Sequence, residues 1–281
     1  MKIAGVQMDV ALADKERNLQ TIEDRLREAV RHGAQLVVFP ECAVTGYCFE
    51  SLAEAQAVAE PMDGPSVRRL EAMCREYDVF AVVGTVEADG PRVFNVCVLT
   101  GPQGLLGVYR KIHLPHLGLD NFSTPGDRPF RVWQAGPIRL GMNICYDVSF
   151  PESSRIMALA GADLIALPTN WPPGAGCVAC YAPNTRAMEN HVYYIAVNRV
   201  GEERGFQFIG QSRICEPYGN TIASADETSE TILYAEIDPE LPRNKHLVRV
   251  PSKHEIHRFH DRRPEMYGPL VEPVQRADHP A

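Results

Sequence analysis

The spacing of apolar positions predicts alternating strands and helices in the first half of the chain. Leu19, Ile22 and Leu26 recur at intervals of three and four residues, which places them on one face of a helix, and Gly33 follows as a stop signal. Pro65 lies near the first turn of a second helical pattern, a position that proline favours. The predicted helices cover 15–31 and 65–77, and the predicted strands cover 2–8, 35–39, 79–85, 93–100 and 105–110.

The second half repeats part of this order. A strand predicted at 138–144 leads through a turn to a helix at 152–160. The next segment, 161–168, reads Gly-Ala-Asp-Leu-Ile-Ala-Leu-Pro, and the segment 33–40 reads Gly-Ala-Gln-Leu-Val-Val-Phe-Pro. This likeness indicates two related strand–helix–strand halves. A further helix is predicted at 177–190, and further strands near 192–199, 206–215, 219–224 and 230–237.

Alternating strands and helices that are rich in Val, Ile and Leu favour an α/β layered fold with a covered sheet. The 281 residues are 45% hydrophobic and 23% charged, so the chain can bury a sizeable core without metals or disulfides. No low-complexity linker divides the chain, which predicts one domain over 1–281. From about residue 239, prolines, histidines and arginines without periodicity predict an extended C-terminal arm that packs on a partner subunit.

Charge and hydropathy narrow the possible partners. The formal charge is −8 and the sequence has no basic run, which argues against nucleic acid and anionic membranes as partners. The apolar runs at 36–39 and 163–168 are far shorter than the roughly 20 residues of a membrane-spanning helix. The first residues enter a strand without a signal-peptide pattern. Eight cysteines form no obvious disulfide framework, so a soluble, cytoplasmic protein with buried thiols is expected.

Three predicted strands end in polar residues that a strand does not need. Glu41 follows Phe39-Pro40, Lys111 follows the strand over 105–110, and Cys145 ends the segment Gly-Met-Asn-Ile-Cys just before a turn and helix. Strand ends are where ligands usually bind in α/β sheets. Each residue alone has a structural explanation: a core thiol, a turn-capping carboxylate or a surface ammonium. Their joint occurrence makes them candidates for catalysis.

These segments resemble the three signature segments of the nitrilase superfamily of carbon–nitrogen hydrolases. The likeness rests on 39–41, on Arg-Lys-Ile-His-Leu-Pro at 110–115 and on Ile-Cys-Tyr-Asp-Val-Ser-Phe-Pro-Glu at 144–152. The segments 45–47, 185–190 and 261–267 are also similar to family segments, so the resemblance covers nearly the whole chain. It implies a four-layer α-β-β-α sandwich, subunits that pair as a homodimer or a higher homo-oligomer, and no metal or organic cofactor.

The resemblance also implies an amidohydrolase mechanism. Cys145 is expected to attack the amide carbon, Glu41 to act as base and then acid, and Lys111 to stabilise the charge with the backbone N–H of Tyr146. A thioester would form and water would release the acid. Many family members have a second glutamate after the lysine segment, but residues 112–126 contain none. Asp120 is the only acid there that could orient Lys111 or the substrate, and a simple turn-capping role is equally open.

The expected substrate is a small amide. Nitrile-cleaving members usually have Cys-Trp-Glu at the nucleophile, whereas this chain has Cys-Tyr-Asp at 145–147, which is more similar to the amidase and carbamoylase branches. Tyr47, Phe150 and Trp171 are candidates for the substrate pocket, with core packing as the alternative for each. N-carbamoyl amine hydrolysis remains open, and nitrile cleavage and a non-catalytic binding role are less favoured.

Two further patterns do not predict a metal site. Cys177 and Cys180 form one pair, and a zinc ribbon needs a second pair. His254, His257 and His260 are three residues apart, whereas the zinc-protease pattern places two histidines four apart on a helix. A thiol pair and a solvated or interface arm are the expected explanations.

Overall fold

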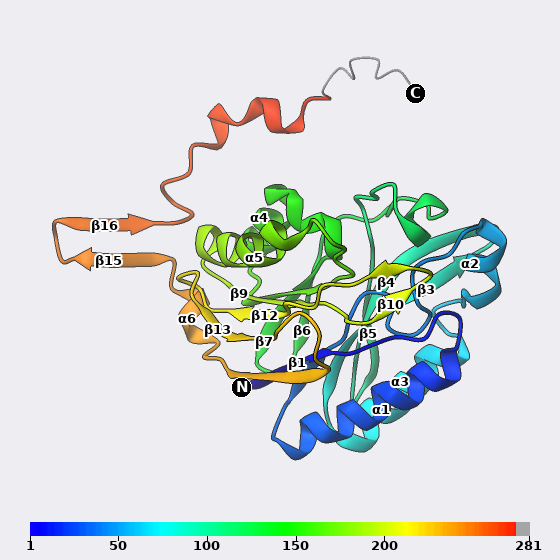
Figure 1. Cartoon of the computed structure of the whole chain (residues 1–281). Coiled ribbons are helices and arrows are strands. Elements are labelled where there is room, and N and C mark those ends of the chain that lie inside the picture. The colour runs from blue at the N-terminus through cyan, green and yellow to red at the C-terminus, as the bar shows by residue number, and fades with distance from the viewer. Residues whose placement is uncertain (274–281) are drawn as a thin grey trace. The chain divides into compact units, whose positions relative to one another are not determined.

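The computed structural model describes residues 1–273 and divides into two compact units, Met1–Arg243 and the segment that begins at Asn244. The first unit contains two six-stranded sheets (Figure 1). In the first sheet the strand order is β14 (Thr231–Glu236), β1 (Lys2–Gln7), β2 (Leu36–Val38), β3 (Phe80–Asp89), β4 (Arg92–Gly101) and β5 (Gly104–Arg110). In the second it is β13 (Thr221–Ser224), β12 (Arg213–Cys215), β9 (Tyr193–Val197), β8 (Leu164–Pro168), β7 (Ile138–Met142) and β6 (Val132–Ala135).

Each sheet is covered by helices on its outer face. Helices α1 (Lys15–Arg31) and α3 (Pro65–Tyr77) lie together on the first sheet, and α4 (Pro151–Leu159) and α5 (Gly176–Asn190) lie on the second (Figure 1). The inner faces pack on each other where β1 meets β9: a Cβ at Gly5 would lie only 3.0 Å from a methyl group of Val197. The four layers confirm the α-β-β-α sandwich that the family resemblance implied.

The two halves are built alike, as the repeated segment indicated. Strands β1, β2 and β3 run parallel and are linked through α1 and α3, and β7, β8 and β9 run parallel and are linked through α4 and α5. Since the strands of each trio are parallel, the residues that follow them lie at one edge of their sheet. Glu41 therefore follows the middle strand of the first trio, and Cys145 follows the first strand of the second.

Helices α1 and α3 have the predicted bounds. The side chain of Asp14 caps α1 by accepting a hydrogen bond from the backbone N–H of Arg17, and the periodic residues Leu19, Ile22 and Leu26 are buried. Pro65 is the first residue of α3, and Asp78 ends that helix in a left-handed conformation with φ 50°. Local capping and periodicity thus agree with the tertiary packing.

Other predictions need correction. The strand expected over 206–215 is two strands, β11 (Phe206–Gln207) and β12, separated where Gly210 and Gln211 adopt positive φ values of 55° and 60°. β11 pairs with β10 (Glu202–Glu203). Helix α2 (Leu52–Val58) and strand β6 were not predicted, because both are short and their apolar residues show no clear period. No helix within residues 1–273 is long and apolar enough to cross a membrane.

The C-terminal segment contains more regular structure than the expected extended arm. A short helix, α6 (Glu240–Arg243), ends the first unit. The second unit contains an antiparallel hairpin of β15 (His246–Val250) and β16 (His254–His257), followed by two 3-10 turns at Pro264–Met266 and Gly268–Val271. The alternation that produces the hairpin is hidden in the sequence, because histidines and charged residues occupy many of its positions.

Candidate active site

Glu41 follows β2 on a turn that is pressed against β3. Cys42 has a left-handed φ of 50°. A Cβ at Gly84 would lie 2.3 Å from the backbone nitrogen of Cys42 and 2.5 Å from the carbonyl oxygen of Pro40. Only glycine fits there without moving the turn. This close packing holds the Glu41 side chain inside the protein, with 1% of the residue exposed.

Lys111 lies between two buried carboxylates. It follows β5, and its Nζ donates to Oε1 of Glu41 at 2.7 Å and to Oδ2 of Asp120 at 2.5 Å. Asp120 comes from the short 3-10 helix Gly118–Asn121. All three side chains are inaccessible to solvent. The sequence left two partners open for Asp120, Lys111 or the substrate, and the structure places it in contact with Lys111.

Asn95 on β4 links the same two carboxylates. Its Nδ2 donates to Oε1 of Glu41 at 2.7 Å and to Oδ1 of Asp120 at 2.9 Å, which uses both of its amide hydrogens. Its Oδ1 accepts a weak hydrogen bond from the Cys42 thiol at 3.7 Å. Sequence analysis missed this residue. The available signal was a single amide within an otherwise apolar strand.

The cluster carries one negative charge in excess if both carboxylates are ionised, since Lys111 supplies one positive charge against two negative ones. Burial raises the pKa of Glu41, and the charge of Lys111 opposes this shift. Burial lowers the pKa of the Lys111 ammonium, but Asp120 and Glu41 outweigh it and raise that pKa well above its ordinary value. Lys111 therefore stays charged, and Glu41 takes up a proton more readily than an exposed glutamate.

Tyr47, expected in the substrate pocket, is part of this polar network. Its hydroxyl donates to Oδ2 of Asp120 at 2.8 Å, and its ring centroid is 5.9 Å from Nζ of Lys111. A Cβ at Gly118, which has a φ of 46°, would lie 2.8 Å from the Tyr47 ring. The ring thus packs directly against the turn that holds Asp120.

A buried ion pair from the second half fixes the backbone at Tyr47. Oε2 of Glu203 accepts the backbone N–H groups of Tyr47 at 3.0 Å and Cys48 at 2.8 Å. The other oxygen of Glu203 pairs with Arg199, which is fully buried and also donates to Asp9 at 2.7 Å. Glu203, which is 155 positions from Cys48 in sequence, therefore holds the loop that supports Asp120.

Cys145 lies in a strained turn at the end of the second-half sheet. Its φ is 44°, in the left-handed region that residues other than glycine seldom adopt and that is common at functional sites. Asp147 stabilises the turn by accepting the backbone N–H of Ile144 at 2.9 Å and the hydroxyl of Tyr109 at 2.7 Å. It also contacts Nδ1 of His113 at 2.7 Å. The lysine segment and the cysteine turn are thereby joined.

The thiol of Cys145 is buried and uncharged. Burial, and then the Glu41 carboxylate, raise the pKa of Cys145 to about 12, while the charge of Lys111 acts in the opposite direction. The backbone N–H of Asn170 also lowers this pKa. The hydroxyl of Thr169 is close enough to lower the pKa too, although it forms no hydrogen bond of ordinary geometry. Lys111 alone therefore does not produce a thiolate, so attack requires a base.

The remaining predicted residues lie in different surroundings. Phe150 is half-buried and stacks on His113 with ring centroids 3.7 Å apart. Tyr146 is 40% exposed and meets Phe150 edge to face. Trp171 is buried, and its backbone N–H donates to Asn198 at 2.9 Å. Whether Phe150 and Trp171 contact substrate remains a prediction.

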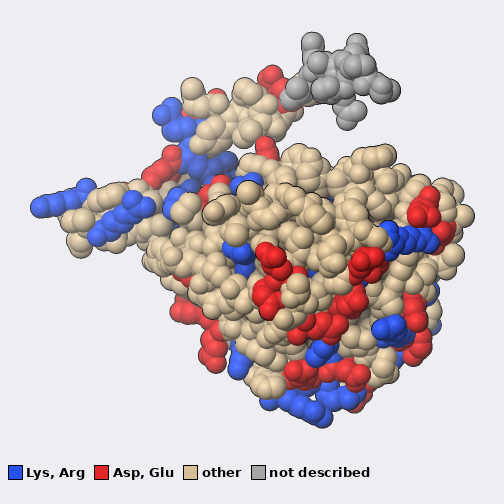
Figure 2. All heavy atoms as spheres, in the orientation of Figure 1, with Lys and Arg blue, Asp and Glu red and all other residues tan. Residues whose placement is uncertain are grey.

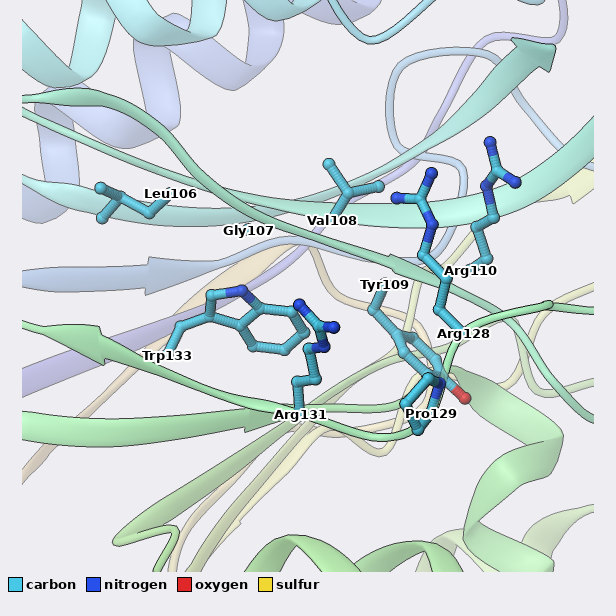
Figure 3. A pocket seen from close by; sticks show the side chains of 9 residues that line it. All are labelled: Leu106, Gly107, Val108, Tyr109, Arg110, Arg128, Pro129, Arg131 and Trp133. Atoms are coloured by element: carbon cyan, nitrogen blue, oxygen red, sulfur yellow. The ribbon is translucent and has the colours of Figure 1, made fainter. Parts of the chain in front are cut away.

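A cavity of about 220 Å³ lies at the edge strands of the two sheets (Figure 3). It is lined by Leu106, Gly107, Val108, Tyr109, Arg110, Arg128, Pro129, Arg131 and Trp133. In Figure 3, Leu106 and Trp133 lie toward one end and Arg110 and Arg128 toward the other. Arg110 is paired with Glu87, Asp89 and Asp127, so its charge is compensated. None of the three proposed catalytic side chains lines this cavity.

A second cavity, of about 190 Å³, lies next to the loops of the site. It is lined by Cys48, Phe49, Glu50, Leu117, Gly118, Glu203, Arg204 and Phe206. Two of these loops support the cluster of Glu41, Lys111 and Asp120: Cys48 follows Tyr47, and Gly118 begins the turn of Asp120. This cavity therefore borders the supports of the site rather than the thiol itself.

The cysteine pair and the three histidines of the sequence analysis form no metal site within the described residues. Within residues 1–273, no group of three or more His, Cys, Asp or Glu side chains could hold a metal ion. Cys177 and Cys180 are exposed on α5 as free thiols. His254 and His257 belong to β16, and His260 follows it, with its ring stacked on His257 at 3.6 Å.

In the view of Figure 2, Lys and Arg side chains gather on the second unit, the segment that begins at Asn244, and no extended basic region appears on the rest of the surface shown. Lys and Arg side chains alternate there with Asp and Glu over the side that holds α1 and α3, whereas the face over α4 and α5 is largely uncharged. Ion pairs such as Arg69–Glu16 and Arg25–Glu230 explain the mixed pattern.

Comparison with known proteins places these features in a family. The model of the family described as carbon-nitrogen hydrolase matches residues 2–244. A protein named nitrilase from Pyrococcus abyssi is 42% identical over 271 residues, which are 95% of this chain and 99% of the relative. An (R)-stereoselective amidase from a Pseudomonas species is 34% identical over 235 residues, 83% of this chain and 84% of the relative.

A solved structure shows the same fold with a modified thiol. It is a variant of the amidase from Nesterenkonia sp. AN1, described as having the acetamide moiety of fluoroacetamide covalently added at the active-site cysteine. The TM-score is 0.80 at 25% identity, with 95% of each chain covered. That amidase thus has the fold found in this chain, and its nucleophile is a cysteine, the type expected in this chain.

Proposed function

Because the chain belongs to the carbon-nitrogen hydrolase family and so hydrolyses C–N bonds other than peptide bonds, we propose that it is an amidohydrolase whose nucleophile is Cys145. The substrate is a small amide, and the products are ammonia and a carboxylic acid. One observation carries the proposal: a carboxylate, an ammonium group and a thiol from three distant segments meet in one buried site. Glu41 is the base and Lys111 the electrostatic partner.

The first step is attack by the thiol. Because the pKa of Cys145 is raised to about 12, the group is a neutral thiol at pH 7. Glu41, whose own pKa is raised, accepts the thiol proton as sulfur bonds to the amide carbon. Its Oε2 is buried and has no hydrogen-bond partner within residues 1–273, so it is available for this proton. Lys111 remains charged throughout.

The second step is collapse of the tetrahedral intermediate. Nζ of Lys111 and the backbone N–H of Tyr146 stabilise the negative oxygen, an effect typically equal to about 3–4 kcal/mol per donor. Glu41 returns the proton to the departing nitrogen, the C–N bond breaks, and ammonia leaves. A thioester between Cys145 and the acyl group remains. Water, deprotonated by Glu41, then attacks the thioester, which releases the acid and restores the thiol.

Two supporting residues hold the catalytic groups. Asp120 and Asn95 fix Lys111 and Glu41 through the hydrogen bonds already described. Asp120 thereby takes the orienting role that a second glutamate has in many related enzymes. It is a positioning residue, since its contacts are with Lys111, Asn95 and Tyr47.

A second candidate is hydrolysis of a nitrile, which the name of the Pyrococcus abyssi relative favours. The same thiol would add to the nitrile carbon, with its proton passing to the nitrogen, and give a thioimidate. One water would then displace ammonia and leave the thioester, and a second water would release the acid. Hydrolysis of an N-carbamoyl amine uses the same three groups and is the other alternative. Both use the same nucleophile, base and ammonium group as the proposed reaction.

Ammonia release from short aliphatic amides, ω-amides, N-carbamoyl amines and nitriles tests the proposal. Amide turnover should be present in the wild type, absent in Cys145→Ala, and unchanged in Cys177→Ala, which removes an exposed thiol. Nitrile turnover without amide turnover would favour the second candidate. Amide turnover that survives in Cys145→Ala would contradict the assignment of the nucleophile.

A homodimer or higher oligomer, in the cytoplasm, is the state we propose for the enzyme. Support for assembly comes from apolar side chains exposed on α4 and α5, namely Ile156, Leu159, Tyr181 and Met188. All eight cysteines are free, as expected in a reducing compartment. Sedimentation of the wild type and of Tyr181→Glu tests the assembly: the variant should be smaller. A wild-type monomer would contradict it.

A further inference from the structure

Four buried polar atoms have no hydrogen-bond partner within the described part of the chain, and they belong to three residues that act on the Cys145 thiol. They are Oε2 of Glu41, Oγ1 of Thr169, and Nδ2 and Oδ1 of Asn170. Asn170 is 1% exposed and Thr169 is fully buried. Buried polar groups in folded proteins are nearly always paired, so a cluster of exceptions needs an explanation. An atom of the substrate is the natural partner when the cluster surrounds a nucleophile.

The fold places Thr169 and Asn170 beside Cys145. They follow β8, which is the parallel neighbour of β7, and Cys145 follows β7. The backbone on both sides of Asn170 is fixed: the N–H of Thr169 donates to Val197 at 2.9 Å and that of Trp171 to Asn198 at 2.9 Å. The backbone that carries the Asn170 side chain is therefore fixed before any ligand binds, which reduces the entropy lost on binding.

The unpaired atoms are complementary to a carboxamide. The side-chain amide of Asn170 offers one acceptor and two hydrogens, and the Thr169 hydroxyl can donate or accept. A substrate carboxamide has one carbonyl acceptor and N–H donors, so both ends of Asn170 can be satisfied. A nitrile has one acceptor nitrogen and no donor, which leaves Oδ1 of Asn170 buried and unpaired. A site that leaves its own polar group unpaired discriminates against such a ligand.

We propose that Asn170, assisted by Thr169, binds the carboxamide group of the substrate and makes the site selective for amides over nitriles. This inference rests on the proposed function, because it takes Cys145 as the nucleophile. It deepens that function by naming the specificity-determining residue and by choosing between the two substrate classes that the comparisons leave open.

Alkylation of the thiols tests the inference without any turnover. Iodoacetamide carries a carboxamide, and iodoacetonitrile carries a nitrile in its place. In both reactions the sulfur forms a bond to the CH₂ carbon, the C–I bond breaks, iodide leaves, and the thiol proton passes through Glu41 to solvent. Mass spectrometry of peptides gives the rate at each cysteine. The exposed Cys177 and Cys180 report the intrinsic rate ratio of the two reagents in the same molecule.

We expect the iodoacetamide-to-iodoacetonitrile rate ratio at Cys145 to exceed the ratio at the exposed thiols by about tenfold, the effect of one or two neutral hydrogen bonds. In Asn170→Ala the two ratios should become equal. Asn170→Asp keeps the size of the side chain but loses both N–H donors, and should give a reduced ratio. A Cys145 ratio equal to that of the exposed thiols in the wild type would overturn the inference, even if no variant folds.

The outcomes separate this inference from the proposed function. Amide turnover with no reagent preference at Cys145 contradicts only the role of Asn170. A clear preference without turnover of any amide contradicts only the proposed function. In turnover assays, Asn170→Ala should raise KM for amides by about tenfold and leave KM for nitriles nearly unchanged, if nitriles are cleaved at all.

Discussion

The two halves of the sandwich end their middle parallel strands in the same way but supply different chemistry. Strand β2 leads to Phe39-Pro40-Glu41, and β8 leads through Leu167-Pro168 to Thr169. In the first half the residue after the proline is a buried carboxylate, and in the second it is a neutral hydroxyl. The backbone is repeated, whereas the group presented to the site is not.

This difference separates the groups proposed for acid–base chemistry, which come from the first half, from the proposed nucleophile. A buried carboxylate needs compensation, and Lys111, Asn95 and Asp120 all belong to or follow strands of the first sheet. The second half supplies a thiol with a raised pKa and a neutral hydroxyl, which need no counter-ion. Acid–base chemistry thus comes from one half and the nucleophile from the other.

The largest effect should come from a comparison of two substitutions, one at Glu41 and one at Thr169, each by a residue of similar shape. Glu41→Gln keeps the shape but cannot accept the thiol proton, so amide turnover should fall by about a thousandfold or more. Thr169→Val removes a group that only assists binding, and turnover should fall by about tenfold. Steady-state kinetics with folding checked by circular dichroism compares them. Equal losses in the two variants would remove the proposed division of roles.

The charge compensation of the first half should be visible in its stability. Lys111→Met leaves two carboxylates buried without a counter-ion, so the free energy of unfolding should fall by about 3–5 kcal/mol. The double variant Lys111→Met/Asp120→Asn removes one of these carboxylates and should recover part of the loss. Urea denaturation at pH 7 measures both. If Lys111→Met is as stable as the wild type, the ammonium charge of Lys111 does not stabilise the two buried carboxylates.

The support that the second half gives to the first can be tested at Glu203. Glu203→Gln weakens the contact with Arg199 and with the backbone N–H groups of Tyr47 and Cys48, and should cost about 2 kcal/mol of stability and lower kcat. Glu54→Gln is the matched control, because Glu54 pairs with Arg204 at the surface and should contribute less than about 1 kcal/mol. Equal effects on stability would argue against an anchoring role for Glu203.

The smallest effect concerns the neutral thiol of the second half. Since the pKa of Cys145 is raised to about 12, the unfolded chain ionises this thiol above its ordinary pKa of about 8.5 and the folded protein does not. The contribution is complete below about pH 8.5 and is lost as the pH rises toward 12. The stability of the wild type relative to Cys145→Ala should fall by about 1.4 kcal/mol per pH unit between pH 9.5 and 10.5.

Denaturant unfolding at these pH values provides the measurement. Cys177→Ala, which removes an exposed thiol, is the control and should follow the wild type. Parallel pH curves for the wild type and Cys145→Ala would show that the thiol ionises equally in the folded and unfolded chains, which would contradict the raised pKa of Cys145.

Local patterns predicted much of the fold and the identities of the main site candidates. Helices α1 and α3 were predicted with the bounds they have, because capping residues and an apolar period act within one segment. Glu41, Lys111 and Cys145 were recognised from short segments around them. The sequence analysis missed β6, which has only four residues, and the hairpin β15–β16, in which histidines and charged residues obscure the alternation.

The sequence by itself determined the repeated strand–helix–strand order, the family of the chain and the three residues proposed to be catalytic. Only the tertiary structure decided what surrounds them. Asn95 contacts Asp120, 25 positions away, and Glu203 contacts Tyr47, 156 positions away. Asn170 lies beside Cys145 because β7 and β8 are parallel neighbours. No spacing along the chain encodes such contacts. Burial in the tertiary structure also sets the chemistry of these groups. Removal of water raises the pKa of Cys145, and it makes an unpaired amide, such as that of Asn170, unfavourable in free energy.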